Sequence, residues 1–164
     1  MNEPALTVDD LLAWLEKTST GWRKLLTGHP ELFSTPCDIM GVHTVAQLLQ
    51  HIVAVELRYA QQLADQPISE YDAIPFDSIE SIYATHDRAI EILQQLLDSG
   101  IDWEAPIEFV TRTMGSARSK RKTILFHALL HSIRHYAQLA TLARQHGVKP
   151  DWQMDYLVMD LERA

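Results

Sequence analysis

The stretch from Ile124 to Ala143, ILFHALLHSIRHYAQLATLA, decides the fold of this chain. Its only side chain that is charged at every pH is that of Arg134. A helix that is apolar on nearly every face is buried on several sides, so this segment is predicted to be a central helix packed among others. His127, His131 and His135 follow one another within it at intervals of four residues. Because a buried polar group without a partner costs about 1–3 kcal/mol, these imidazoles need partners in the folded protein.

Outward from this stretch, the sequence predicts three more long amphipathic helices. Each has apolar residues at helical spacing and begins near residues that cap helices, such as Thr7 with Asp10 and Thr44 with Gln47. The four predicted helices run from Val8 to about Leu26, from after Thr44 to about Asp65, from the start signals Asp77 and Glu80 to Gly100, and from Lys120 to Gln145.

The connections between these helices are predicted to be loops, with one irregular stretch. Pro36 and Gly41 mark a loop before the second helix. Ile101–Ser119 lacks helical periodicity, and Ile107–Arg112 within it is predicted to be a short extended piece because β-branched residues alternate there. The last segment, Asp151–Ala164, has enough apolar residues to dock against the helices.

Length and composition favour one domain, residues 1–164, in the cytoplasm. The predicted fold class is all-α: a four-helix bundle with a short irregular or extended segment before the last long helix and a short C-terminal segment. Cys37 is the only cysteine, and the acidic beginning of the chain does not resemble a secretory signal, which favours a reducing compartment. The net charge of −8 argues against nucleic-acid binding, and no apolar run is long enough to span a membrane.

Three histidines are the candidate metal ligands: His51, His131 and His135. His131 and His135 are four residues apart, so they share one helix face and both can point at one ion. His51, beside the apolar face of the second helix, could complete a three-nitrogen site with one coordination position left open, as is typical of catalytic metal sites. The alternative is that these are core histidines with ordinary hydrogen bonds.

The last long helix resembles that of a known family. The run Phe126–Gln138, FHALLHSIRHYAQ, followed by Leu142–Gly147, is similar to the pattern H-x-x-N-H-x-x-H-H-R-G-Q of the DinB/YfiT-like superfamily of metal-dependent enzymes. Thr44–Val53, TVAQLLQHIV, resembles the second helix of that family. Pro150–Tyr156 is similar to its C-terminal segment, in which a proline precedes an Asp-Tyr pair.

The resemblance implies a helical bundle, a homodimer and metal ligands at His51, His131 and His135. Gln138 also matches the family pattern. The chain departs from the pattern at three places, with Leu130 for the Asn, Arg134 for the first His of the pair, and Tyr136-Ala137 for the Arg-Gly. These departures leave the ligand positions intact and change the residues around them.

Other polar residues have weaker functional interpretations. His127 is interpreted as a pocket-wall or outer-sphere group, although a core histidine bonded to a backbone carbonyl is the commoner case. His86, on the apolar face of the third helix, is interpreted as structural, with a place at the border of the pocket as the alternative. Gln138 is a candidate acceptor for the second N–H of a ligand imidazole. Glu56 is rotated away from His51 on the same helix and is expected to be solvated or to bridge helices rather than to act as a general base.

Five cations lie just before or at the start of the last long helix: Arg112, Arg118, Lys120, Arg121 and Lys122. A patch that receives an anionic substrate or cofactor is the functional interpretation, and a solvated basic loop is the one that we favour. Cys37 is expected to be an inert loop residue rather than a nucleophile.

The predicted function is that of a metal-dependent enzyme acting on a small-molecule substrate. Imidazole ligation suits zinc, nickel or iron, and such an ion lowers the pKa of a bound water or thiol. The resemblance implies thiol chemistry, that of S-transferases or isomerases using low-molecular-weight thiols such as bacillithiol or mycothiol. Metal-assisted hydrolysis of a carbonyl compound is the second hypothesis. The third is a non-enzymatic dimeric helical module with a structural metal or none.

Overall fold

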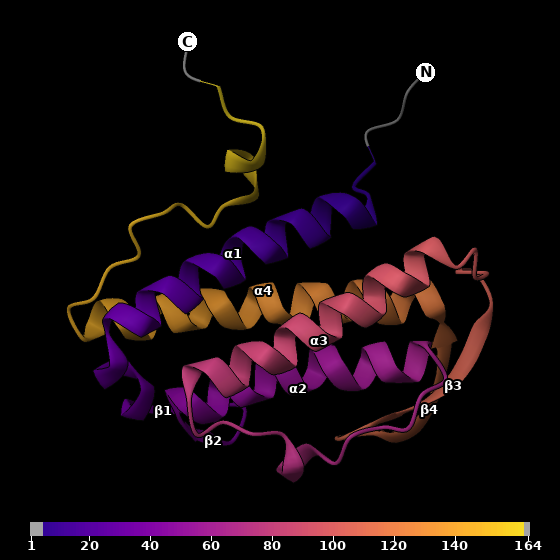
Figure 1. Ribbon diagram of the computed structural model, residues 1–164, viewed down its shortest axis with the longest axis horizontal. Coiled ribbons are helices and arrows are strands. Elements are labelled where there is room, and N and C mark those ends of the chain that lie inside the picture. Colours follow the sequence, from indigo (N-terminus) through magenta and orange to yellow (C-terminus); the bar gives the residue numbers. More distant parts are fainter. Residues whose placement is uncertain (1–4, 163–164) are drawn as a thin grey trace.

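Four long helices pack together in the computed structural model, which describes residues 5–162 (Figure 1). They are α1 (Val8–Gly28), α2 (Val45–Leu63), α3 (Ile79–Asp98) and α4 (Arg121–Gln145). The short 3-10 helices η1 (Pro30–Ser34), η2 (Tyr71–Ala73) and η3 (Tyr156–Met159) lie in the segments that connect or follow them. The chain is mostly helical, as predicted, and the predicted helix bounds are wrong by only one or two residues.

Capping residues place the beginnings of the helices. Thr7 and Asp10 form the predicted capping box, in which the Asp10 N–H donates to Thr7 Oγ1 at 3.1 Å and the Thr7 N–H donates to the Asp10 carboxylate at 2.9 Å. Thr44 Oγ1 accepts from the Gln47 N–H at 3.2 Å and so caps α2. The cap of α3 is Ser78.

Two β-hairpins correct the all-α prediction. β1 (Pro36–Ile39) pairs antiparallel with β2 (Val42–Thr44) directly before α2, where a plain loop was predicted. β3 (Pro106–Thr111) pairs antiparallel with β4 (Gly115–Lys120) directly before α4. The predicted extended piece, Ile107–Arg112, falls largely on β3, whereas its partner strand was not predicted.

The core lies between the helices. α2 packs against α3 and α4, and α4 also packs against α1, so the apolar stretch of α4 is covered from two sides, as predicted. Trp22 of α1 and Tyr136 of α4 are fully buried and stack with ring centroids 6.3 Å apart. Tyr83 of α3 is another of the largest buried side chains. Each such side chain contributes about 1.5–3 kcal/mol by leaving water.

The segment after α4 turns back and passes along the outer side of α1 (Figure 1). Trp152 meets Trp22 edge to face, with ring centroids 5.4 Å apart, and Trp14 Nε1 donates to the Met154 carbonyl at 2.7 Å. A Cβ on Gly21 would lie 2.3 Å from the Trp152 ring, so glycine is needed for this close approach. The C-terminal segment therefore docks as predicted, against α1.

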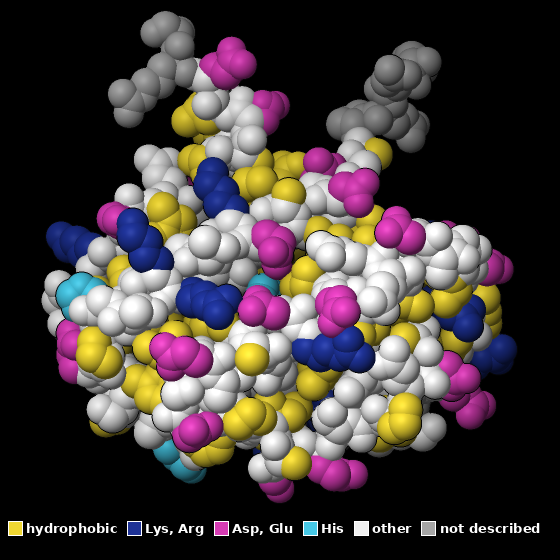
Figure 2. Space-filling model, viewed as in Figure 1, with side chains coloured by type: hydrophobic (Ala, Val, Ile, Leu, Met, Phe, Trp, Pro, Cys, Tyr) yellow, Lys and Arg dark blue, Asp and Glu magenta, His cyan; other side chains and the backbone are white. Residues whose placement is uncertain are grey.

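The surface shown in Figure 2 carries acidic and basic side chains interspersed, without a continuous basic region. Among the residues that the structure describes, no helix has the length and apolar character needed to cross a lipid bilayer.

Candidate metal centre

His51, His131 and His135 come together between α2 and α4. One ligand nitrogen of each residue lies within 4.8 Å of those of the other two. The ring centroids are 4.9 Å apart for His51 and either partner, and 4.4 Å apart for His131 and His135. Three imidazole nitrogens at such separations could hold one divalent ion. The prediction that these three residues lie close together in the folded chain is therefore confirmed.

The helices determine this convergence. His131 and His135 are separated by one turn of α4, so their rings project from the same face, and His131 Nε2 lies 3.2 Å from His135 Nε2. α2 packs against that face and brings His51 to it. His51, His131 and His135 are 8%, 7% and 0% exposed, so the cluster is almost wholly withdrawn from bulk water.

The cluster disfavours protonation of its imidazoles. Burial, with the neighbouring His135 as a second cause, lowers the pKa of His51 from 6.5 to about 4. Burial and the same neighbour lower the pKa of His131 to about 2, and burial also lowers the pKa of His135. At neutral pH the three rings are neutral, which is the form that binds metal ions.

The hydrogen bonds around the cluster leave two of its ring nitrogens without a partner among the described residues, while Arg134 Nη2 lies 3.4 Å from His135 Nε2. His135 Nδ1–H donates to Gln138 Oε1 at 2.6 Å, which turns its Nε2 lone pair toward His131. His51 Nδ1 lies 3.4 Å from the Tyr71 hydroxyl. His51 Nε2 is buried and has no hydrogen-bond partner among the described residues, and the same is true of His131 Nδ1. A buried imidazole nitrogen without a partner beside two others fits a metal ligand better than a core histidine.

A cavity of about 480 Å³ opens above the cluster. His51 and His131 contribute to its lining, and His135 is fully buried behind them. Tyr59 and Tyr71 supply aromatic walls. Three guanidinium groups also line it, those of Arg58, Arg112 and Arg134. Among the described residues of the lining there is no aspartate or glutamate.

His127 lies in the wall of this cavity. It is exposed, its ring centroid is 5.7 Å from that of His131, and it also borders an adjoining apolar pocket with Tyr59. The pocket-wall interpretation thus describes its position, and the commoner alternative of a core histidine does not.

His86 and Glu56 lie in a separate buried network. His86 Nδ1 is 2.7 Å from Glu56 Oε2, and its Nε2 is 3.1 Å from Glu16 Oε1. His86 is therefore structural, as favoured, and the alternative that it borders the pocket is wrong. Glu56 is only 1% exposed, so it bridges helices and is not solvated.

The five cations just before and at the start of α4 do not form one patch. Lys120 and Lys122 both pair with Glu104, and Arg121 donates to the Asp102 carbonyl. Only Arg112 reaches the cavity, where its guanidinium lies 4.1 Å from the centroid of the Tyr71 ring. For most of this stretch, the interpretation as a solvated basic segment is the better description. Only Arg112 remains a candidate for binding an anion in the cavity.

Cys37 lies on β1, away from the lining of the cavity. Burial raises the pKa of its thiol, with the Asp38 charge as a lesser cause. A raised thiol pKa makes Cys37 a poor nucleophile, in agreement with the expected inert role.

Sequence reasoning missed Tyr71, Arg58 and the functional position of Arg134. Tyr71 comes from η2, in the segment between α2 and α3, which has no motif. Arg134 was noticed as a departure from a family pattern, and its helix position between His131 and His135 was the signal that it would lie near the cluster.

Comparison with known proteins gives a family match. The sequence matches the DinB family model over residues 1–162, a range that contains all three clustered histidines. The resemblance derived from the last long helix is thereby confirmed. No curated protein matches the chain.

Proposed function

The chain belongs to the DinB family, and from this premise we propose that it is a metal-dependent enzyme with His51, His131 and His135 as ligands of one divalent ion, zinc, nickel or iron. The observation that carries the proposal is the convergence of three neutral, buried imidazoles within 4.8 Å at the base of a cavity of about 480 Å³. The open side of the site faces a space of the size that a small molecule occupies.

Thiol-dependent transfer or isomerisation is the reaction class that we propose. A divalent ion held by three neutral imidazoles would supply the Lewis acidity that keeps a thiol deprotonated at neutral pH. A thiolate attacks without a protein base, and the described lining of the cavity has no carboxylate to act as one. Gln138 orients His135, while Tyr59 and Tyr71 supply aromatic walls of the cavity.

Metal-assisted hydrolysis is the second candidate, and His127 is the residue that favours it. Partial desolvation in the cavity wall, with the Arg134 charge as a second cause, lowers the pKa of the His127 ring, so the ring is neutral at pH 7 and able to accept a proton. It stands in the cavity wall beside His131. Replacement of His127 by Phe should therefore abolish a hydrolytic activity and leave a thiol transfer largely intact.

Metal uptake is the first test. Untagged protein purified without a nickel column should contain about one first-row metal ion per chain by elemental analysis. His131→Ala should abolish this uptake while the helical content by circular dichroism is kept. The matched control is His43→Ala, since His43 is exposed on β2 outside the cluster. A wild-type chain that takes up neither zinc, nickel nor iron would refute the proposal.

The second test separates the two reaction classes. The metal-loaded protein is assayed with low-molecular-weight thiols and an electrophilic acceptor, and in parallel with a panel of esters and amides. Thiol consumption that depends on His131 supports transfer, and release of acid from esters or amides without thiol supports hydrolysis. If neither panel reacts while the metal is bound, the metal is structural, and the non-enzymatic module is the correct description.

We also propose that the protein is a homodimer, as the resemblance to DinB/YfiT-like proteins implies. Large apolar side chains stay exposed in the C-terminal segment, with Leu157 at 71% and Leu161 at 58% exposure, which supports a surface for a second copy.

A further inference from the structure

We infer that the substrate of this site carries an oxyanion, a carboxylate or a phosphate, which Arg112 and Arg134 bind beside the metal. The inference rests on the proposed function for the position of the metal. It goes further in naming the charge that the cavity accepts. Its basis is that three arginines line a cavity in which the described residues include no carboxylate.

None of these arginines has a carboxylate partner among the described residues. Arg58 donates to the Ser69 carbonyl, Arg112 lies over the Tyr71 ring, and Arg134 Nη2 is 3.4 Å from His135 Nε2. Two arginines elsewhere on the surface differ. Arg23 pairs with Asp87, and Arg88 pairs with Glu91.

The overall composition makes this concentration of positive charge notable. The chain has 22 acidic and 14 basic residues. In this acidic chain, three arginines share one cavity whose described lining holds no carboxylate. A cavity of one charge sign raises the local concentration of ligands of the opposite sign.

Two of the arginines stand next to the ligand histidines. Arg134 approaches His135 directly, and Arg112 stacks on Tyr71, whose hydroxyl lies 3.4 Å from His51 Nδ1. A dication held by neutral imidazoles would add its charge to these guanidinium groups. An anion placed between the metal and the arginines removes that repulsion, whereas a neutral or cationic substrate does not.

The chemistry of guanidinium indicates which anion fits. Its planar fork of N–H groups matches the two oxygens of a carboxylate or phosphate. Arg112 and Arg134 are both exposed toward the cavity, so their N–H groups are accessible to a ligand, whereas Arg58 is occupied with a backbone carbonyl. We therefore assign the main anion contacts to Arg112 and Arg134.

Isothermal titration calorimetry with inorganic phosphate and with succinate tests the inference, on zinc-loaded and on metal-free protein. Succinamide, the uncharged analogue of succinate, is the ligand control. Arg112→Gln and Arg134→Gln should each weaken binding about tenfold or more, because a hydrogen bond to a charged group contributes about 1.5–3 kcal/mol. Arg23→Gln, outside the cavity, should leave binding unchanged. Zinc content and melting temperature are measured for every variant.

The outcomes separate this inference from the proposed function. If neither anion binds to the wild type, or if zinc-loaded protein binds them equally well in both arginine variants, the inference is overturned. If zinc is not taken up but the metal-free protein binds anions through the two arginines, the metal proposal fails and the anion site stands. Tighter binding of phosphate or of succinate identifies the group that the substrate carries.

Discussion

Gln138 determines which nitrogen of His135 faces the cluster. Its carbonyl oxygen accepts from His135 Nδ1–H at 2.6 Å, and the lone pair of Nε2 is thereby directed toward His131 Nε2, 3.2 Å away. Such outer acceptors hold the ligand ring in one tautomer and raise its basicity. The contribution of this residue can be measured separately from that of the ligands themselves.

We predict that Gln138→Ala weakens zinc binding by about 10–100-fold without unfolding the protein. Competition with a chromogenic chelator gives the dissociation constant. Gln145→Ala is the matched control, because Gln145 is exposed at the end of the same helix, α4. Equal zinc affinity in the wild type and Gln138→Ala would mean that this hydrogen bond does not support a metal ligand.

At the scale of elements, the sequence predicted the helices well because their signals are local. Thr7 with Asp10 and Thr44 with Gln47 form the expected caps, and apolar spacing defines the buried faces. The hairpin of β3 and β4 was missed because β4, GSARSK, has neither β-branched residues nor apolar alternation, and is extended only through its pairing with β3.

The difference between local sequence signals and tertiary packing also explains which residues of the site were predicted. His131 and His135 are neighbours through helical geometry, and His51 joined them through a family resemblance. Tyr71 and Arg112 reach the cavity from a 3-10 turn and from the end of a hairpin. Their positions depend on the tertiary packing of connecting segments, which no periodicity in the sequence encodes.

A buried ionic network joins three of the helices. His86 of α3 lies between Glu56 of α2 and Glu16 of α1, with His86 and Glu56 both nearly inaccessible to water. We predict that His86→Leu lowers the free energy of unfolding by about 3–5 kcal/mol, because it leaves Glu56 buried without its partner. Urea denaturation of the metal-free protein measures the loss.

Glu16→Gln is the control for this network. The Glu16 side chain is 47% exposed, so its ion pair is screened by water and its replacement should cost about 0–1 kcal/mol. If His86→Leu costs no more than Glu16→Gln, then the network does not hold α2 and α3 together.

The network also predicts a dependence of stability on pH. Burial by itself lowers the pKa of His86, but the charge of Glu56 and the hydrogen bonds with both carboxylates outweigh burial and raise this pKa from 6.5 to about 10. The folded protein therefore binds the proton more tightly than the unfolded chain does. This stabilisation is fully present below pH 6.5 and is lost as the pH rises toward 10.

We accordingly expect the free energy of unfolding of the metal-free protein to fall between pH 6.5 and 10. Urea denaturation at intervals of one pH unit gives the profile. In His86→Leu this part of the decline should disappear. A variant that declines as steeply as the wild type over the same range would assign the effect to other groups.

At the scale of the whole molecule, charge is distributed unevenly. The chain is acidic overall, with a formal net charge of −8, while the described lining of the main cavity carries three arginines and no acidic residue. A cavity lined by one charge sign raises the local concentration of ligands of the opposite sign, in line with the anionic substrate inferred above.

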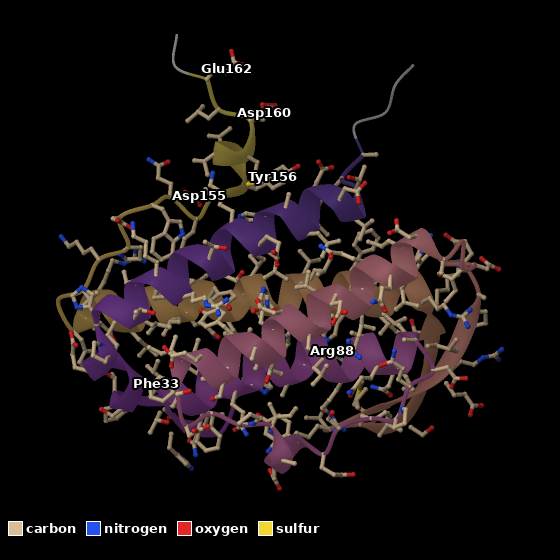
Figure 3. The ribbon with its side chains drawn as sticks, viewed as in Figure 1. Phe33, Arg88, Asp155, Tyr156, Asp160 and Glu162 are labelled. Carbon is tan, nitrogen blue, oxygen red and sulfur yellow. The ribbon has the colours of Figure 1, made fainter. Side chains whose placement is uncertain are left out.

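The C-terminal segment leads to the last prediction, the oligomeric state. The segment is anchored to α1 through Trp14 and Trp152, and Tyr156 also packs edge to face on Trp14, with ring centroids 5.4 Å apart. Asp155 and Asp160 flank Tyr156 on the outer side of α1 (Figure 3). In the proposed homodimer, the exposed leucines of this anchored segment would be covered by the second copy.

We predict that light scattering gives a mass twice the 18.7 kDa of one chain. The double variant Leu157→Asp/Leu161→Asp should shift the protein to the monomer, because charges placed in an apolar interface are costly to bury. Met114→Asp is the control, since Met114 is 75% exposed on the turn between β3 and β4, away from this segment. A wild type that stays monomeric at all concentrations would show that these leucines do not serve self-association, and it would remove the dimer from the proposed function without affecting the metal site.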